Sequence, residues 1–453
     1  MAFSSDQLPD ILRQQPPPTG LLVAFSGGRD STVLIHALAA VRDRLAVPLR
    51  AIHINHDLHA DAAHWARRCK DFAASLGIDY ISRSVAIDPA DGRGLEAAAR
   101  AARYAALDAE LRPGEWLLTA HHADDQLETV LLQLLRGGGP AGLAAMPARA
   151  PFGAGCLVRP LLQFQRQELA AYADANWLEF IDDPSNTDRQ RDRNYLRHEI
   201  LPRLTERWPA AAATVGRAAR HAAQAKALLA DLAALDLAQV AQTDSETLPL
   251  ESVLALGRER AENLLRHWLT QRKLPVPDTR RLDALLSQAA EAAGDKAPQV
   301  LWPGVEARCW RGRIYAFPPL VEVPPLPAQW HGEPLDLGAE MGELRTVAGK
   351  GTLRADVLTE GVEIRWRRGG ERIRLAGQQH RRELKDLLRE AGIVPWMRSR
   401  IPLLWYKDEL AAVGDLWVAD EFAASANEPA ARIEWRQRPV ISSGGDNVSR
   451  AVR

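Results

Sequence analysis

Hydrophobic and polar positions in the first 135 residues alternate between short apolar runs and longer segments with helical spacing. The apolar runs are typical of buried strands, and the segments between them repeat apolar residues every three or four positions. The predicted strands are 20–25, 49–55, 79–87 and 115–121, and the predicted helices are 30–45, 60–76, 94–111 and 124–136. This alternation indicates an α/β fold with a doubly wound parallel sheet, whose ligands bind at the carboxyl ends of the strands.

The pattern changes after residue 136. A glycine-rich turn at 137–142 is followed by a shorter unit with a predicted helix over 165–176, and an alanine-rich segment at 209–242 predicts further helix. Five prolines between 317 and 330 are typical of a semi-rigid linker. We therefore expect a first α/β domain over 1–205, a mainly helical middle domain over 206–317, a proline-rich linker over 318–335, a small C-terminal α+β domain over 336–436 and a disordered tail over 437–453.

Composition narrows the class of protein. Of the 453 residues 46% are hydrophobic and 25% are charged, which excludes a disordered chain. Cys69, Cys156 and Cys309 are far apart, so a disulfide framework and a zinc knuckle lose support and a reducing compartment is expected. We find no secretory signal and no apolar run of 18 residues, and we therefore expect a soluble cytoplasmic protein that does not enter a membrane.

The strongest candidate for chemistry is SGGRDS at 26–31, between a predicted strand and a predicted helix. Glycines and the first amides of a helix bind phosphate, but the lysine of ATP-hydrolysing loops is missing. An aspartate at Asp30 suits Mg²⁺ on nucleotide oxygens, which favours release of pyrophosphate and formation of an adenylate. The alternative is a glycine turn capped by Asp30. The candidate ATP-binding residues are Ser26, Gly27, Gly28, Arg29, Asp30 and Ser31.

Two predicted helices carry further candidates. HHADDQLET at 121–129 places Asp125 and Glu128 on one face, opposite a stripe of leucines that includes Leu134 and Leu135 and is expected to be buried. These acids could hold a metal or an ammonium group, or merely interact with the helix dipole. On the preceding helix, Arg100 and Arg103 share a face with Glu96, which alone would suggest a salt-bridged surface.

Two polar regions are candidates for contact with RNA. The stretch 182–204 contains Arg193, Asn194 and Arg197, although a surface linker would look similar. Between 361 and 400, eleven Arg or Lys face only five Asp or Glu, in a chain whose net charge is -1. This run includes Arg381, Arg382 and Lys385, and Trp366 and Trp396 could pack internally or stack on bases. A solvated basic face is the alternative.

These motifs together resemble a known family. SGGRDS resembles the pyrophosphate loop (PP-loop) of the N-type ATP pyrophosphatases. Over about 20–205 the chain is similar to the tRNA(Ile)-lysidine synthetases, because the following motifs occur in this order: SGGRDS, AIHINHDL, GLEAAARAARY, HHADDQLET, GPAGL, RPLL and DDPSN…DRNYLRHEILPRL. The similarity returns at 367–405, which resembles that family's tRNA-contacting domain. One departure is His56-Asp57-Leu58-His59, where the family often has Gly-Leu-Arg after its histidine.

The resemblance implies a two-step ligation. ATP adenylates the C2 oxygen of cytidine 34 in the CAU anticodon of tRNA(Ile), pyrophosphate leaves, and L-lysine displaces AMP to give lysidine. It further implies Mg²⁺ at Asp30, phosphate stabilisation by Arg100 or Arg103, and lysine binding and deprotonation by Asp125 and Glu128. Arg193, Asn194, Arg197, Arg381, Arg382 and Lys385 are the expected tRNA contacts. The oligomeric state is left open between a monomer and a homodimer.

The nearest rival function is a PP-loop tRNA thiolase, which transfers sulfur to an adenylated base. Such enzymes usually require paired cysteines or an iron-sulfur Cys-x-x-Cys, and this chain has neither. Ligation therefore remains the favoured interpretation.

Overall fold

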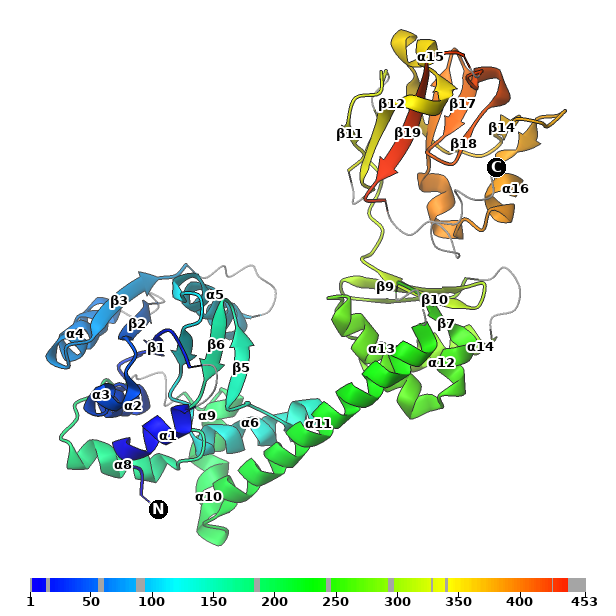
Figure 1. Cartoon of the computed structure of the whole chain (residues 1–453). Coiled ribbons are helices and arrows are strands. Elements are labelled where there is room, and N and C mark those ends of the chain that lie inside the picture. The colour runs from blue at the N-terminus through cyan, green and yellow to red at the C-terminus, as the bar shows by residue number, and fades with distance from the viewer. Residues whose placement is uncertain are drawn as a thin grey trace. The chain divides into compact units, whose positions relative to one another are not determined.

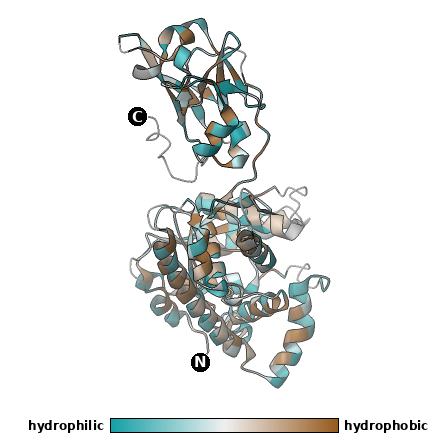
Figure 2. Cartoon of the chain, turned by 90° about the vertical axis from the view of Figure 1, so that its right-hand side faces the viewer, coloured by the Kyte–Doolittle hydropathy of each residue, from teal (hydrophilic) through white to brown (hydrophobic). Residues whose placement is uncertain are grey.

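The structure is a computed structural model, and it describes residues 2–13, 17–55, 61–86, 94–182, 188–241, 246–291, 297–326, 329–338, 341–425 and 427–438. The chain divides into two units, residues 1–228 and 229–453, with the boundary inside one long helix. Helices of both units carry hydrophobic and hydrophilic residues together, as expected for elements that cover a core (Figure 2).

A six-stranded sheet organises the first unit (Figure 1). Its spatial order is β3-β2-β1-β4-β6-β5, and all neighbouring strands are parallel except the antiparallel edge pair β5–β6. The strands are β1 (Leu21–Ala24), β2 (Leu49–Asn55), β3 (Asp79–Ser84), β4 (Trp116–Leu118), β5 (Arg149–Phe152) and β6 (Gly155–Val158). The strands run outward from β1 through β2 to β3, and the chain then returns to the other side of β1 with β4, so the predicted doubly wound α/β fold is confirmed.

Helices cover both faces of this sheet. They are α1 (Leu8–Leu12), after the 3₁₀ turn η1 (Ser5–Gln7), α2 (Arg29–Ala40), α3 (Arg42–Leu45), α4 (Ala62–Ser75), α5 (Leu95–Glu110), α6 (Ala123–Leu135), α7 (Pro140–Leu143) and α8 (Arg166–Ala175). Leu21 and Val23 of β1 pack with α2 and α8 on one face, whereas Leu22 packs with Leu107 of α5 on the other. Alternate residues of the central strand therefore serve two separate cores.

Three details differ from the pattern-based expectation. The predicted helix over 30–45 is two helices, because Val41 leaves the helical conformation between α2 and α3. The β5–β6 hairpin was not predicted, since neither strand exceeds four residues. On α6, Leu127 is buried, but Leu134 and Leu135 are 58% and 76% exposed, so the apolar stripe loses its cover in the last turn.

A continuous helical segment follows the sheet. It consists of α9 (Asp192–Tyr195), the π-helical turn η3 (Leu196–Ile200) and α10 (Leu201–Arg207), and it leads to the long helix α11 (Ala211–Ala241). A π turn widens a helix by one residue and is often found at functional sites. Here it lies at Arg197, one of the candidate site residues.

The second unit begins with helices on a small antiparallel sheet. The helices are α12 (Leu250–Ala255), α13 (Arg258–Gln271) and α14 (Thr279–Glu291), and the sheet runs β7 (Leu248–Pro249), β10 (Arg313–Phe317), β9 (Val305–Trp310), β8 (Gln299–Trp302). Trp268 and Leu282 lie in their shared core.

The rest of the unit is α+β. Its strands are β11 (Leu335–Asp336), β12 (Glu343–Arg354), β13 (Glu363–Trp366), β14 (Arg372–Ile373), β15 (Arg382–Glu383), β16 (Pro402–Tyr406), β17 (Glu409–Val413), β18 (Trp417–Val418) and β19 (Ala430–Arg436). Its helices are α15 (Ala355–Glu360) and α16 (Leu384–Glu390), with 3₁₀ turns η4 (Pro395–Arg400) and η5 (Asp420–Phe422). The antiparallel sheets fit the predicted small α+β domain.

Two further expectations concern the C-terminal tail and membrane-spanning helices. The predicted disordered tail lies outside the described residues beyond Arg438. Among the helices that the structure describes, none combines the length and apolar character that crossing a bilayer requires.

Candidate active site

The SGGRDS loop connects the carboxyl end of β1 to the first turn of α2. Ser31 Oγ lies 3.1 Å from Ser26 Oγ and donates to the carbonyl oxygen of Gly28 at 2.9 Å. Thr32 Oγ1 contacts the carbonyl oxygens of Gly27 and Gly28 at 3.2 and 3.1 Å. These bonds fix the loop, and the first amides of α2 remain available to an anion.

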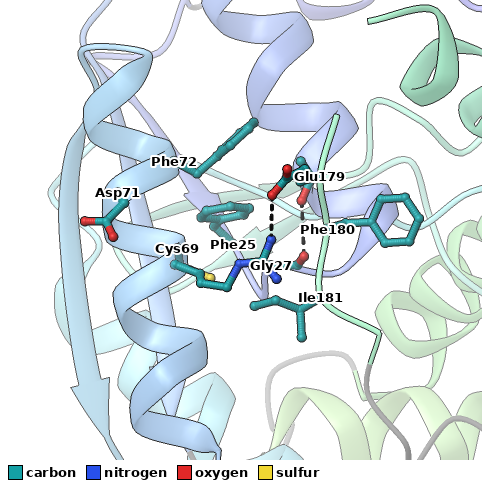
Figure 3. Close-up of a pocket in the computed structure, with 10 residues that line it drawn as sticks. Phe25, Gly27, Cys69, Asp71, Phe72, Glu179, Phe180 and Ile181 are labelled. Atoms are coloured by element: carbon teal, nitrogen blue, oxygen red, sulfur yellow. Dashed lines mark hydrogen bonds and ion pairs between the residues drawn. The ribbon is translucent and has the colours of Figure 1, made fainter. Parts of the chain in front are cut away.

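Gly27 is held in a clasp, by which we mean that the side chains of Ile181 and Cys69 pack against its α-carbon. Its φ is +83°, and a Cβ at this position would lie 2.6 Å from Ile181 Cδ1 and 2.7 Å from Cys69 Sγ. Ile181 N also donates to the carbonyl oxygen of Gly27 at 2.9 Å, and Figure 3 shows Gly27 between the two side chains. A pocket of about 240 Å³ adjoins this contact and includes Phe25 among its lining residues. The clasp explains why a glycine is required at this position.

We predict that Gly27→Ala lowers the free energy of unfolding by about 2 kcal/mol, because it adds both a clash and an unfavourable φ. The matched control is Gly28→Ala, since Gly28 has an ordinary φ of -69° and its Cβ would lie 3.5 Å from Ser26 Oγ. We expect that control to stay within about 1 kcal/mol of the parent in urea denaturation. Equal losses in both variants would contradict the clasp.

His122 lies among three carboxylates, two from the first turn of α6 and one from α2. It is the N-cap residue, and its side chain is 3% exposed. The ring nitrogens lie 3.5 Å from Asp30 Oδ2, from Asp124 Oδ2 and from Asp125 Oδ2. Burial alone would lower the pKa of His122, but Asp124, Asp30 and Asp125 outweigh it and raise this pKa to about 10. The imidazole is therefore cationic at neutral pH.

Asp30 stays ionised in this arrangement. Burial alone would raise the pKa of Asp30, but His122 and, less strongly, Arg29 and Arg166 together lower it. Sequence reasoning overlooked His122. The signal was present, since a histidine shortly after a strand lies two and three residues before Asp124 and Asp125.

The predicted acids Asp125 and Glu128 do come together, and both meet arginine. Glu128 is 1% exposed and accepts hydrogen bonds from Arg193 Nε at 2.9 Å and from Arg197 Nε at 2.7 Å. Arg197 Nη2 also donates to Asp125 Oδ1 at 3.1 Å. Arg193 lies on α9 and Arg197 on the π turn that follows it, so two successive turns of one helical segment bring both guanidinium groups to α6.

This arrangement changes two expectations. Both carboxylate oxygens of Glu128 are already taken by arginines, so an ammonium group could reach Glu128 only by displacing one of them. Asn194 was expected to meet RNA, but it is 9% exposed and its Nδ2 donates to the carbonyl oxygen of Asp188 at 2.9 Å. The burial and the backbone bond indicate that Asn194 stabilises its own turn.

Arg100 and Arg103 lie on α5 and flank Tyr104. Their Cζ atoms are 4.9 and 5.7 Å from the centroid of the Tyr104 ring, within range of cation–π attraction. Arg103 lies near enough to Arg193 for the two charges to interact. The side chain of Glu96, the expected salt-bridge partner, lies outside the described part of the structure.

The basic residues of the C-terminal part are mostly ion-paired. Arg381 contacts Glu409 and Glu421, Arg382 contacts Glu390, and Lys385 contacts Glu383 at 2.6 Å. In the pairs with Glu409, Glu390 and Glu383 at least one side chain is half exposed or more, so water and salt screen the attraction and these ion pairs are weak. A phosphate could therefore replace the carboxylate partner at little cost.

The two tryptophans of this region pack internally. Trp396 is 9% exposed and stacks on Phe317, with ring centroids 5.8 Å apart. Trp366 is half-buried, and its Nε1 donates to the carbonyl oxygen of Pro324 at 2.7 Å. Of the two roles considered for them, the structure favours packing.

Three known domain families match separate parts of the chain. Residues 4–204 match a PP-loop domain, residues 248–315 a TilS substrate binding domain and residues 362–435 a TilS substrate C-terminal domain. The PP-loop match contains the Ser26–Ser31 loop and the carboxylates of α6.

A solved structure is similar to part of the chain. It is the U34-tRNA thiolase NcsA from Methanococcus maripaludis with its [4Fe-4S] cluster, with a TM-score of 0.41 and 16% identity. The similarity covers 48% of this chain and 77% of that one.

Curated relatives are similar over nearly the whole chain. The tRNA(Ile)-lysidine synthase from Alkalilimnicola ehrlichii is 45% identical over 412 residues, which are 90% of this chain and 92% of that protein. The tRNA(Ile)-lysidine synthase from Methylococcus capsulatus is 41% identical over 92% of this chain and 97% of its own length. At this identity and coverage, the chain belongs to the tRNA(Ile)-lysidine synthase family of ATP-dependent ligases.

Proposed function

We propose that this chain joins L-lysine to C2 of cytidine 34 in the CAU anticodon of tRNA(Ile), at the expense of ATP. One observation carries the proposal beyond family membership. The phosphate-binding loop Ser26–Ser31 lies next to His122 and the carboxylates of Asp30 and Asp125, so a nucleotide in the loop would have its α-phosphate beside ionised groups. An adenylating ligase needs this combination.

In the first step, the O2 oxygen of cytidine 34 bonds to the α-phosphorus of ATP, and the bond to pyrophosphate breaks. The loop amides bind the departing pyrophosphate, while Arg100 and Arg103 stabilise negative charge on the phosphate. His122 is cationic and holds the carboxylates of Asp30 and Asp125 towards the loop. We propose His122 as a positioning residue, which sequence reasoning alone did not identify.

Mg²⁺ fits this site through Asp30. The Asp30 carboxylate is ionised and its side chain is 32% exposed, so it can reach a ligand at the loop. Mg²⁺ usually takes one or two carboxylates together with phosphate oxygens and water, so a single aspartate suffices. When bound, the metal would neutralise charge on the phosphates.

In the second step, an amine of lysine bonds to C2 of the activated cytidine and the bond to AMP breaks. Both carboxylate oxygens of Asp125 also accept hydrogen bonds, from Arg197 and from the His122 backbone N–H at 3.0 Å, but its side chain is 14% exposed against 1% for Glu128. We propose that the more exposed Asp125 binds the ammonium group and helps to remove its proton. Glu128 would then act indirectly, by holding Arg193 and Arg197 against α6. We therefore assign the direct contact with lysine to Asp125 and a positioning role to Glu128.

The basic residues of the C-terminal part support tRNA binding. We predict that a double reversal, Arg381→Glu with Arg382→Glu, weakens tRNA binding and lowers the slope of log affinity against log salt by about two. Filter binding over a salt series measures both quantities. The control is Arg13→Glu with Arg44→Glu, an equal change of charge at exposed pairs in the first unit. If the slopes of both variants match the parent, this surface does not contact tRNA.

The function is tested by incubating the chain with ATP, Mg²⁺, radiolabelled lysine and tRNA(Ile) that carries CAU. We expect lysine in the tRNA and one pyrophosphate released for each lysine joined. Replacing cytidine 34 by uridine should abolish both signals. Incorporation of sulfur in place of lysine, or release of phosphate in place of pyrophosphate, would reject the proposal. We propose the cytoplasm as the location, since tRNA, ATP and lysine are available there.

A further inference from the structure

Three arginines next to the candidate active site have no carboxylate partner among the described residues. They are Arg100 and Arg103 on α5, and Arg159, which follows β6 directly. The other charges of the site are matched, because His122 faces three aspartates, and Arg193 and Arg197 face Asp125 and Glu128. Among the side chains that the structure describes, this half of the site is therefore cationic without a matching carboxylate.

Arg159 is the most confined of the three. It is 7% exposed, its backbone N donates to the carbonyl oxygen of Ala148 at 2.8 Å, and its Nη1 donates to that of Pro147 at 2.6 Å. Its buried Nε has no hydrogen-bond acceptor in the described part of the chain. A buried guanidinium group with an unused donor is costly unless a ligand supplies the acceptor.

Tyr104 joins the three side chains into one cluster. Arg100 Nη2 donates to the Tyr104 hydroxyl at 3.4 Å, and the guanidinium groups of Arg100 and Arg103 lie over its ring. Burial lowers the pKa of Arg159, and the Tyr104 hydroxyl acts against burial, so it lies close to that guanidinium. The phenol supplies a hydroxyl oxygen that accepts hydrogen bonds from these groups.

His121 does not supply a negative charge. Its Nδ1 lies 2.9 Å from Thr119 Oγ1. Burial lowers the pKa of His121 to about 4; Asp125 opposes this effect, and Arg159, Arg193 and Arg100 reinforce it. The imidazole is therefore neutral, as expected beside a cluster that is already positive, and no described side chain next to the three arginines offsets their charge.

We propose that Arg159, together with Arg100 and Arg103, binds a phosphate group of the substrates. A guanidinium group donates two parallel hydrogen bonds to phosphate oxygens, and three such groups match a phosphate better than a carboxylate. The phosphate is either a phosphodiester of the anticodon strand or the α-phosphate of ATP. This inference rests on the proposed function, and it adds Arg159 to the residues that contact substrate.

The test uses the full-length chain and two separate ligands. Calorimetry measures the affinity for α,β-methylene ATP without tRNA, and filter binding over a salt series measures the affinity for a tRNA(Ile) transcript without ATP. We expect Arg159→Gln to weaken one of these affinities about tenfold or more, the usual loss for a charge-assisted hydrogen bond. Arg159→Lys should retain part of that affinity, because lysine keeps the positive charge but lacks the two parallel N–H donors of the guanidinium group.

The two ligands distinguish the two phosphates. Weaker binding of the ATP analogue with an unchanged salt slope for tRNA assigns the α-phosphate. A salt slope reduced by about one, with unchanged binding of the analogue, assigns the phosphodiester. If both affinities remain within about twofold of the parent, the proposal is wrong. Neither measurement needs lysine transfer, so a chain that binds both ligands but joins no lysine would refute the proposed function alone.

Two further variants separate ligand binding from folding. Arg50→Gln is the matched control, since Arg50 is also buried but is paired with Glu115 through bonds of 3.2 and 2.6 Å. We expect Arg50→Gln to lower the melting temperature and leave both affinities unchanged, whereas Arg159→Gln should keep the melting temperature of the parent and weaken one affinity. If Arg159→Gln fails to fold, Arg100→Gln changes an exposed member of the cluster and should weaken binding of the same ligand.

Discussion

Asp30→Asn is expected to reduce pyrophosphate release by about a hundred- to a thousandfold, the range for losing one preorganised charged group at a reacting centre. Two physical effects combine in this variant. The carboxylate available to Mg²⁺ is lost, and His122 loses one of its three aspartate contacts. The measurement is the rate of pyrophosphate release in the presence of tRNA, lysine and saturating ATP.

The matched control for this prediction is Asp43→Asn on α3, an exposed aspartate in the helix that follows α2. We expect the control to release pyrophosphate at the rate of the parent. A rate for Asp30→Asn within about twofold of the parent would show that Asp30 neither holds the metal nor orders the site.

Glu128→Gln is expected to lower the free energy of unfolding by about 3 kcal/mol, at the lower end of the range for breaking a buried ion pair. Glu128 is 1% exposed, and both of its oxygens accept from arginine. The arginine side chains are 35% and 23% exposed, so they can turn partly towards water, which limits the loss. Urea denaturation of parent and variant measures the difference.

The control for Glu128 is Glu199→Gln, which removes a surface pair with Arg189 and should cost less than about 1 kcal/mol. The variant also separates the two roles considered for Glu128. If Glu128→Gln keeps its stability but raises the KM for lysine, the carboxylate binds the amino acid directly. A loss of stability with an unchanged KM for lysine supports the positioning role.

Local patterns were sufficient for strands β1 to β4 of the first sheet and for the phosphate loop. Strand and helix periodicity placed β1, β2 and α4 within a few residues, since each element covers or fills a core with its own apolar positions. The Gly-Gly turn was predictable because it requires a positive φ at Gly27. These features are encoded in short stretches of sequence.

The pairing of charges was not predictable from such stretches. Glu128 and Arg197 are 69 positions apart, and the arginine reaches the acid through a π turn that leaves no clear trace in the spacing of apolar residues. Leu134 and Leu135 show the opposite case, in which a clear pattern predicted burial but the side chains are exposed. Their helical spacing predicts burial, but burial also needs a neighbouring element, and spacing carries no information about where that neighbour ends.

The contact of Ile181 with Gly27 has a consequence for folding during synthesis on the ribosome. Ile181 is synthesised 154 residues after Gly27, yet its backbone N–H holds the glycine carbonyl. At roughly 5–20 residues per second, the nascent chain waits about 10–30 s before the turn can take its final shape. A nascent chain that stalls before position 181 would therefore present an unfinished nucleotide cradle, even though every residue of the cradle itself has already been made.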